Sequence, residues 1–257
     1  MKDFLTFLHK EVMELIRTGK GLILLGVFVL LGMMNPFIAK LTPYIMEKMS
    51  KSLSEAGIIT KMTKVTALDS WVQFYKNLPI ALIIMVIAVS SLFAHEYEKG
   101  TLIPFVTKGV SKVSIFMAKE IVVFLIWTIG YWTCWLVTYF YNEYYWNNSS
   151  VTDLMLPAVC WFIFGLWVIC IEMMCLATTS SSNLGLILLL ALVVVFYIGG
   201  TFEKIKDYVP TYLTGGASYL NGQKQLRDMN HVLTVSGISA FLFMIAGVEI
   251  FKNKRLP

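Results

Sequence analysis

The side chains best suited to chemistry outside the long apolar runs lie within residues 95–119. Glu96 and Glu98 form a carboxylate pair directly after an apolar run, where burial does not explain them. Gly100 permits a sharp change of chain direction, and Ser111 is suited to cap a following helix. We predict a short helix that lies beneath a membrane and faces a partner. The alternative is an ordinary solvated turn whose charges pair with one another.

A serine in the last apolar run has the pattern of an intramembrane protease nucleophile, Gly237-Ile238-Ser239-Ala240. Such a serine needs a histidine base within hydrogen-bond reach. His231 precedes it by about two turns on the same expected helix, and His9 and His95 lie in polar segments. The small residues therefore favour close helix packing, with intramembrane proteolysis as an alternative function.

Glu172 is the one carboxylate that the sequence places deep within an apolar run. A charged group there costs about 2.5 to 3.5 kcal/mol on insertion scales, so we expect its side chain to face the protein interior. Ion-coupled secondary transport is the alternative function that this residue suggests. A single carboxylate makes a poor proton relay, however, and Glu172 could equally snorkel to the surface or stay protonated.

Nucleotide, metal and nucleic-acid sites are not indicated. The chain has no G-x-x-x-x-G-K-[ST] phosphate loop, since Gly19-Lys20-Gly21 does not match it. We therefore expect no cofactor or metal on this chain, and ATP hydrolysis by another polypeptide. The basic residues form no dense run, which favours contact with lipid headgroups over nucleic acid. The four cysteines all lie in apolar runs without metal-ligand spacing: Cys134, Cys160, Cys170 and Cys175.

The elements that position these residues follow from composition. Hydrophobic residues make up 57% of the 257 positions, charged residues 14%, and the mean hydropathy is +0.70, which together exclude a water-soluble domain. We predict an all-α membrane protein with one transmembrane domain over 1–257. Six runs are long enough to cross about 30 Å of hydrocarbon. The predicted spans are 21–39, 78–94, 121–141, 154–177, 184–200 and 232–251.

Proline and glycine are expected to mark the ends of several spans. Asn35-Pro36 is predicted to close the first span and Gly199-Gly200 the fifth. Pro79 and Pro157 are predicted to lie in the first turns of the second and fourth spans, where a missing amide donor costs little.

Residues 1–20 precede the first span and have helical amphipathicity, with Phe7 as the one apolar residue on the polar arc. We predict a helix that lies in the headgroup plane. A cleavable signal peptide is the alternative, which the acidic residues of this segment disfavour.

Six spans place both termini on one side of the membrane. Eleven of the 21 lysines and arginines then fall on the side of the termini, and those at 252–255 directly follow the last span. By the positive-inside rule we predict cytoplasmic termini.

Residues 98–119 resemble a motif of the membrane subunits of ABC-2 type exporters. That family carries Glu-x-Gly-Thr-Leu after its second span, then Pro-Val-Ser-Arg, then a lysine at the foot of its third span. Here Glu98-Lys99-Gly100-Thr101-Leu102 matches the first element, Gly109-Val110-Ser111-Lys112 replaces the second, and Lys119 matches the last. Two departures are Gly109 in place of the proline and Pro104, which is expected to break the intervening segment.

The resemblance implies a type V exporter fold in the plasma membrane of a bacterium. Two permease subunits, expected to be identical, would surround a central path, and two cytosolic ATPase subunits carrying MgATP would dock on a coupling helix between the second and third spans. In that family the residues before the last span form short outer helices that dip into the membrane, which we expect of 201–230. The expected ATPase contacts are Glu96, Glu98, Gly100, Thr101, Ser111, Lys112 and Lys119.

The resemblance also implies that the second and fifth spans line the path. From these spans we select four residues as path lining: Met85, Ser90, Phe196 and Tyr197. Both spans are almost purely apolar, which favours an amphipathic or lipophilic cargo. Exporters of antimicrobial or cytolytic peptides in the family have compact permeases of this size, so we expect a peptide, with drugs and lipids as alternatives.

Overall fold

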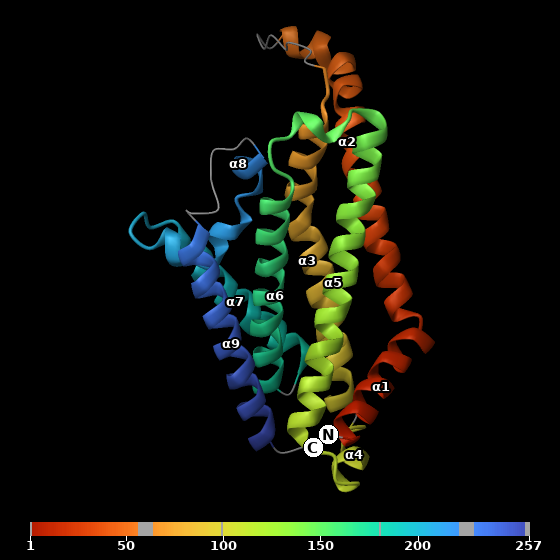
Figure 1. The fold of residues 1–257 in the computed structure, drawn as a ribbon, viewed down its shortest axis with the longest axis vertical. Coiled ribbons are helices and arrows are strands. Elements are labelled where there is room, and N and C mark those ends of the chain that lie inside the picture. The colour runs from red at the N-terminus through yellow and green to blue at the C-terminus, as the bar shows by residue number, and fades with distance from the viewer. Residues whose placement is uncertain (1, 56–63, 99, 180, 221–228, 255–257) are drawn as a thin grey trace.

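The computed structural model describes residues 2–55, 64–98, 100–179, 181–220 and 229–254. These residues form a helical bundle and contain no strand (Figure 1). Six helices are long and apolar enough to cross a membrane, and each overlaps one predicted span, so the six-span prediction is confirmed. They are α2 (Lys20–Glu55), α3 (Ala67–Glu98), α5 (Lys112–Tyr145), α6 (Met155–Thr178), α7 (Ser182–Gly200) and α9 (Asn230–Asn253).

Shorter helices connect these six. The leading helix α1 (Lys2–Arg17) meets α2 at Gly19, whose φ of 70° a glycine adopts readily. Figure 1 places α1, α4 and the end of α9 at the same end of the bundle, which we call the α4 end. The remaining short helices are α4 (Ile103–Thr107), η1 (Asn148–Ser150), η2 (Lys206–Tyr208), η3 (Pro210–Thr214) and α8 (Gly216–Leu220).

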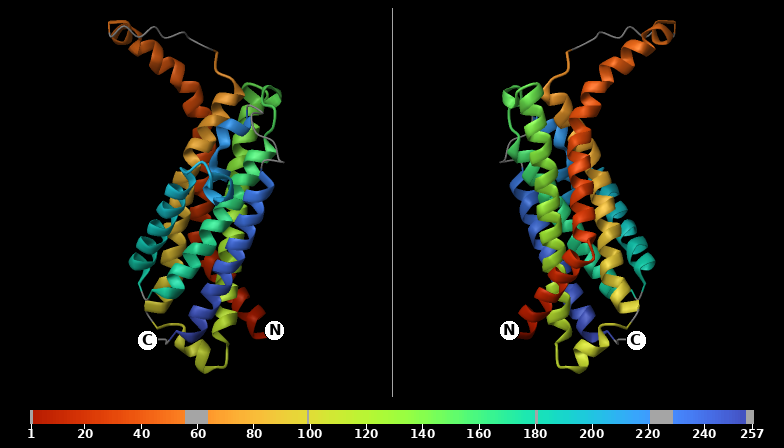
Figure 2. Two further views of the ribbon diagram at one scale, coloured as in Figure 1. Left: turned by 90° about the vertical axis from the view of Figure 1, so that its left-hand side faces the viewer. Right: turned by 90° about the vertical axis from the view of Figure 1, so that its right-hand side faces the viewer.

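The first span does not close at Pro36, contrary to the prediction, because α2 continues through this residue to Glu55 and extends beyond the bundle (Figure 2). Pro36 has no amide hydrogen for the carbonyl of Gly32. The Thr138 hydroxyl on α5 lies 3.0 Å from that carbonyl and donates to it, sharing its proton with the Cys134 carbonyl of its own helix, also at 3.0 Å. Asn35 donates to Thr138 and accepts from Asn77, so a buried polar cluster joins α2, α3 and α5. Such partners make a proline tolerable within a membrane helix.

Pro79 was also predicted at the start of a span, but it lies inside α3, which begins at Ala67. The extra turns are anchored by Trp71, whose indole donates to Asn148 over 2.9 Å and packs on Trp135. Pro157 does lie in the first turn of α6, and α7 does end at Gly200.

The core of the bundle is centred on α5 and α6, the two spans with the largest buried share. The Trp127 indole donates to the Phe162 carbonyl over 3.1 Å, and Tyr131 donates to the Ala158 carbonyl over 2.7 Å. A side chain at Gly165 would approach Trp127 to 2.1 Å, so glycine is required there. In contrast, 11% of the apolar window of α7 and 17% of that of α9 are buried, which leaves both helices open to lipid or a partner.

Candidate functional site

The segment between α3 and α5 turns twice at glycines. Gly100 has φ of 65° and Gly109 has φ of 94°, so both adopt the left-handed conformation that other residues avoid. Between them lies α4, a helix of five residues with no buried side chain. Pro104 lies in its first turn, so this proline begins the helix and does not break it. Ser111 caps α5 by accepting a hydrogen bond from the Ser114 amide over 3.1 Å, as predicted.

The two ends of this segment are joined by an ion pair. Glu96, near the end of α3, lies 2.6 Å from the ammonium of Lys119 in the second turn of α5. The segment 97–118 is therefore a loop closed at its base. Thr101 adds a local contact, since its amide and hydroxyl both donate to the Glu96 carbonyl, over 3.1 and 3.2 Å. The side chain of Glu98 lies outside the described residues.

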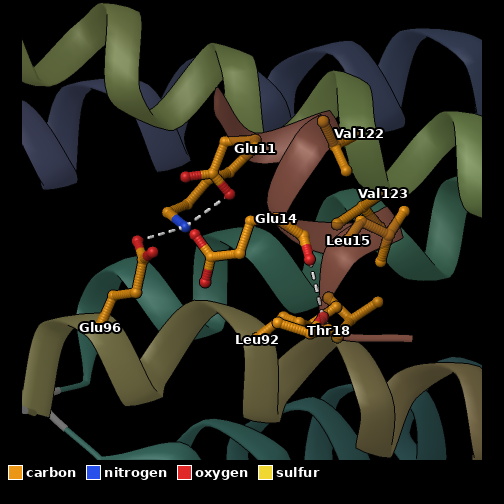
Figure 3. A pocket seen from close by; sticks show the side chains of 10 residues that line it. Glu11, Glu14, Leu15, Thr18, Leu92, Glu96, Val122 and Val123 are labelled. Carbon is orange, nitrogen blue, oxygen red and sulfur yellow. Dashed lines mark hydrogen bonds and ion pairs between the residues drawn. The ribbon is translucent and has the colours of Figure 1, made fainter. Parts of the chain in front are cut away.

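The leading helix α1 contributes three further charged side chains to this pair, of which Figure 3 shows Glu11 and Glu14. Lys10 lies 2.6 Å from Glu96 and 2.7 Å from Glu14, and Glu11 lies 3.0 Å from Lys119. The five side chains form what we call the ion-pair network, which joins α1, α3 and α5. A cavity of about 30 Å³ beside it has room for a single water molecule. The members of the ion-pair network are Lys10, Glu11, Glu14, Glu96 and Lys119.

The network holds Glu96 and Lys10 in their charged forms. Burial alone would raise the pKa of Glu96, but the neighbouring charges of Lys119 and Lys10 outweigh it and hold this pKa below the ordinary value of 4.5. Burial alone would lower the pKa of Lys10, but its hydrogen bonds to Glu14 and Glu96 hold this pKa above the ordinary value of 10.5. The carboxylates Glu11, Glu14 and Glu96 lie within 4.8 Å of one another, a spacing that suits a cation. The two lysine ammonium groups already supply that positive charge.

On the apolar arc of α1, Phe4, Leu8, Val12 and Leu15 pack against the core. The sequence did not indicate that part of the charged arc of α1 also faces the protein. Phe7, the apparent exception on that arc, is 2% exposed and packs edge-on against Phe105 of α4 at 5.2 Å. By contrast, Leu5 and Ile16 on the apolar arc are 56% and 58% exposed. The buried aromatic residue among charged neighbours was the available signal. Placement of α1 in the headgroup plane stays a prediction.

Lys112 lies apart from the network. Its ammonium donates to the carbonyls of Lys252 and Lys254 at the end of α9, over 3.3 and 2.5 Å. The Lys254 ammonium in turn lies 4.1 Å from the ring of Tyr97 on α3. The start of α5, the end of α3 and the end of α9 are thereby connected at the α4 end.

A comparison with protein families shows which family this chain belongs to. The profile described as ABC-2 family transporter protein matches residues 5–249. The chain belongs to the ABC-2 family. No curated protein and no solved structure matches it significantly. Membership makes the chain a multi-pass membrane protein and the permease subunit of an ABC transporter, a subunit that is generally non-catalytic and associates with an ABC ATPase.

Two carboxylates of this ABC-2 permease are buried without a hydrogen-bond partner among the described residues. Glu172 on α6 is 0% exposed, and Glu120 on α5 is 1% exposed. Glu120, which adjoins Lys119, was not among the predicted functional residues. Its spacing with Phe116, one turn before, could have placed it on a buried face. The two carboxylates come from different helices, and no ion pair joins either of them to a described lysine or arginine.

Ser239 does not meet a histidine within the described part of the chain. Its hydroxyl accepts from the Trp167 indole over 2.9 Å and donates to the Val235 carbonyl over 2.7 Å. His231 lies eight residues earlier on the same helix, where its ring contacts that of Tyr208 at 5.9 Å. The geometry supports a packing role for this serine.

An open apolar cavity of about 350 Å³ lies between α3, α6 and the mostly unburied α7. Of the four predicted path residues, Tyr197 lines it. Met85 and Ser90 are 0% and 1% exposed within the chain, with Ser90 accepting from Ser182, and Phe196 packs edge-on against Trp167. Path lining by these residues stays a prediction. The cavity walls include Leu82, Ile83, Val86, Trp161, Phe164 and Leu190.

Proposed function

We propose that this ABC-2 permease is the membrane half of an ATP-driven exporter. Two copies would pair around a central path, and two cytosolic ATPase subunits, which bind MgATP, would dock on α4 and its flanking turns. The termini would be cytoplasmic, in the plasma membrane of a bacterium. The cargo would be amphipathic or lipophilic, with a peptide as the favoured class.

The closed loop at the α4 end is the observation that carries this proposal. The exposed helix α4 projects from the bundle, and the Glu96–Lys119 ion pair of 2.6 Å joins the base of its loop to α3 and α5. A force applied to α4 would therefore move both helices together. Because Lys10 and Glu11 connect α1 to the same pair, the leading helix would move with them.

The cargo class is supported by the apolar cavity beside α3 and α7. Its walls are aliphatic and aromatic, and the lining side chains with a polar group are Tyr197 and Trp161. Such walls offer burial of apolar surface and little to a sugar or a metal ion. The mostly unburied α7 leaves a wide apolar face for a second copy to approach.

The proposal predicts that α4 determines coupling. We would replace exposed Lys108, beside α4, with glutamate, coexpress the variant with its ATPase, and measure copurification and cargo-stimulated ATP hydrolysis. Loss of both is expected, because the charge reversal lies in the expected docking surface. The matched control is Lys252→Glu, which reverses the charge of an exposed lysine of α9 at the same end. Full stimulation in Lys108→Glu would refute docking at α4.

Orientation is tested independently by thiol labelling. The four native cysteines are all buried, so single cysteines at exposed Lys48 and Lys252 report on the two membrane faces. We expect an impermeant reagent added to whole cells to modify Lys48→Cys and to spare Lys252→Cys. The reverse pattern would place α4 outside the cell and remove the basis for a cytosolic motor.

A further inference from the structure

An open groove of about 820 Å³ lies between α2 and α5, away from the proposed cargo cavity. It begins near the closest approach of these helices, where a side chain at Gly32 would meet the Cys134 carbonyl at 2.8 Å. Six apolar side chains and Lys40 of α2 form one wall, and Tyr141 and Tyr145 of α5 form the other. The α2 wall consists of Leu30, Met33, Met34, Pro36, Phe37, Lys40 and Leu41.

The length of this groove matches one leaflet of a bilayer. Residues Leu30 to Leu41 cover about 16 Å at 1.5 Å per residue, about half of the roughly 30 Å of hydrocarbon. Lys40 follows Lys20, the first residue of α2, by about 30 Å along the helix. Lys40 therefore lies at the membrane boundary opposite the α4 end.

A cationic site stands at that boundary. The Lys40 ammonium lies 4.2 Å from the centroid of the Tyr145 ring, and no carboxylate of the described residues is within ion-pair distance of it. Tyr141 stacks on Tyr145 at 6.4 Å, so two aromatic residues with hydroxyl groups flank the lysine. Tyrosines and lysines at this depth contact lipid headgroups. An apolar groove one leaflet long with an uncompensated cation at its end suits an anionic amphiphile.

We propose that the groove binds one phospholipid with an anionic headgroup, from the leaflet opposite the α4 end. One acyl chain lies along the α2 wall, and the phosphate contacts Lys40. This lipid fills the surface between α2 and α5 next to the buried Asn35–Thr138 cluster. The site is separate from the proposed export path, so it stands whether or not the cargo assignment is correct.

The test measures retained lipid on the full-length protein. The permease is placed in nanodiscs with equal amounts of phosphatidylglycerol and phosphatidylcholine of identical acyl chains, released, and examined by native mass spectrometry. We expect selective retention of phosphatidylglycerol. Lys40→Gln should weaken its binding about fivefold, the change that corresponds to about 1 kcal/mol per lysine near an anionic surface. Retention of phosphatidylcholine should not change in this variant.

Two further variants separate headgroup from groove. Lys48→Gln is the matched control, because Lys48 lies two turns further along α2 over the ring of Tyr44 and outside the groove. Met33→Trp should fill the groove and reduce retention of both lipids. Equal retention of the two lipids by the wild type, equal losses in the two lysine variants, or full retention in Met33→Trp would overturn the site. Disulfide-linked dimers of Phe37→Cys would show a second copy on this groove and would also overturn it.

Discussion

Replacing Glu96 with glutamine should detach α1 from the bundle. Glu96 lies 2.6 Å from each of the two lysines of the network, closer than Glu11, which contacts both at 3.0 Å, and the Glu96 side chain is 13% exposed. Removing one partner of a buried ion pair costs about 3 to 5 kcal/mol when the other charge is left unpaired. Lys119, 5% exposed, keeps Glu11 at 3.0 Å, so the cost falls near the value of one hydrogen bond to a charged group, about 2 kcal/mol.

This cost predicts a measurable opening of α1. A loss of about 2 kcal/mol raises the population of detached α1 about 30-fold. Hydrogen exchange detected by mass spectrometry, on protein in nanodiscs, should show α1 amides exchanging faster by about that factor. Exchange in α6, which makes no contact with the network, should not change.

The matched control is Glu249→Gln. Glu249 pairs with Lys252 at 3.4 Å on α9, with both side chains more than half exposed, so this variant removes a carboxylate at the same end without touching α1. Exchange in α1 should equal that of the wild type. If Glu96→Gln leaves α1 exchange within twofold of the wild type, the network does not hold this helix, and force on α4 would not reach it.

Three other perturbations test the packing and the charges. The pKa of Glu96 is held below its ordinary value of 4.5, so the contribution of Glu96 to α1 docking is complete above pH 4.5 and is lost as pH falls through the lowered pKa. The exchange protection factors of α1 should therefore be constant over about pH 5 to 8 and should drop in acid. Gly165→Ala, which overpacks against Trp127, should destabilise the protein by about 1 to 3 kcal/mol in thermal denaturation, whereas Gly237→Ala, with nothing within 4 Å, should not. Thr138→Val should lower the free energy of unfolding in detergent by about 0.6 to 1.7 kcal/mol, because the Gly32 carbonyl loses its donor. Thr128→Val should lower it less, because the Thr128 hydroxyl bonds only to the Phe124 carbonyl of its own helix.

The sequence by itself determined the membrane class, the six spans and the position of the loop at 95–119. Span length and mean hydropathy are local properties, because a helix must cover a fixed hydrocarbon thickness with consecutive residues. The glycine at 100 and the cap at Ser111 were likewise predictable, since φ preference and capping depend on neighbouring residues alone.

Only the tertiary structure decided which groups meet across helices. Pro36 looked like the end of a span because it leaves the Gly32 carbonyl without an amide donor. The hydroxyl that replaces this donor belongs to Thr138, about a hundred residues later in the sequence. Phe7 and Glu120 are likewise buried by residues that lie far from them in the sequence. Helical periodicity gives the side of a helix on which a residue lies, but the element that covers this side depends on packing between distant segments. The ion-pair network therefore emerged only from the fold.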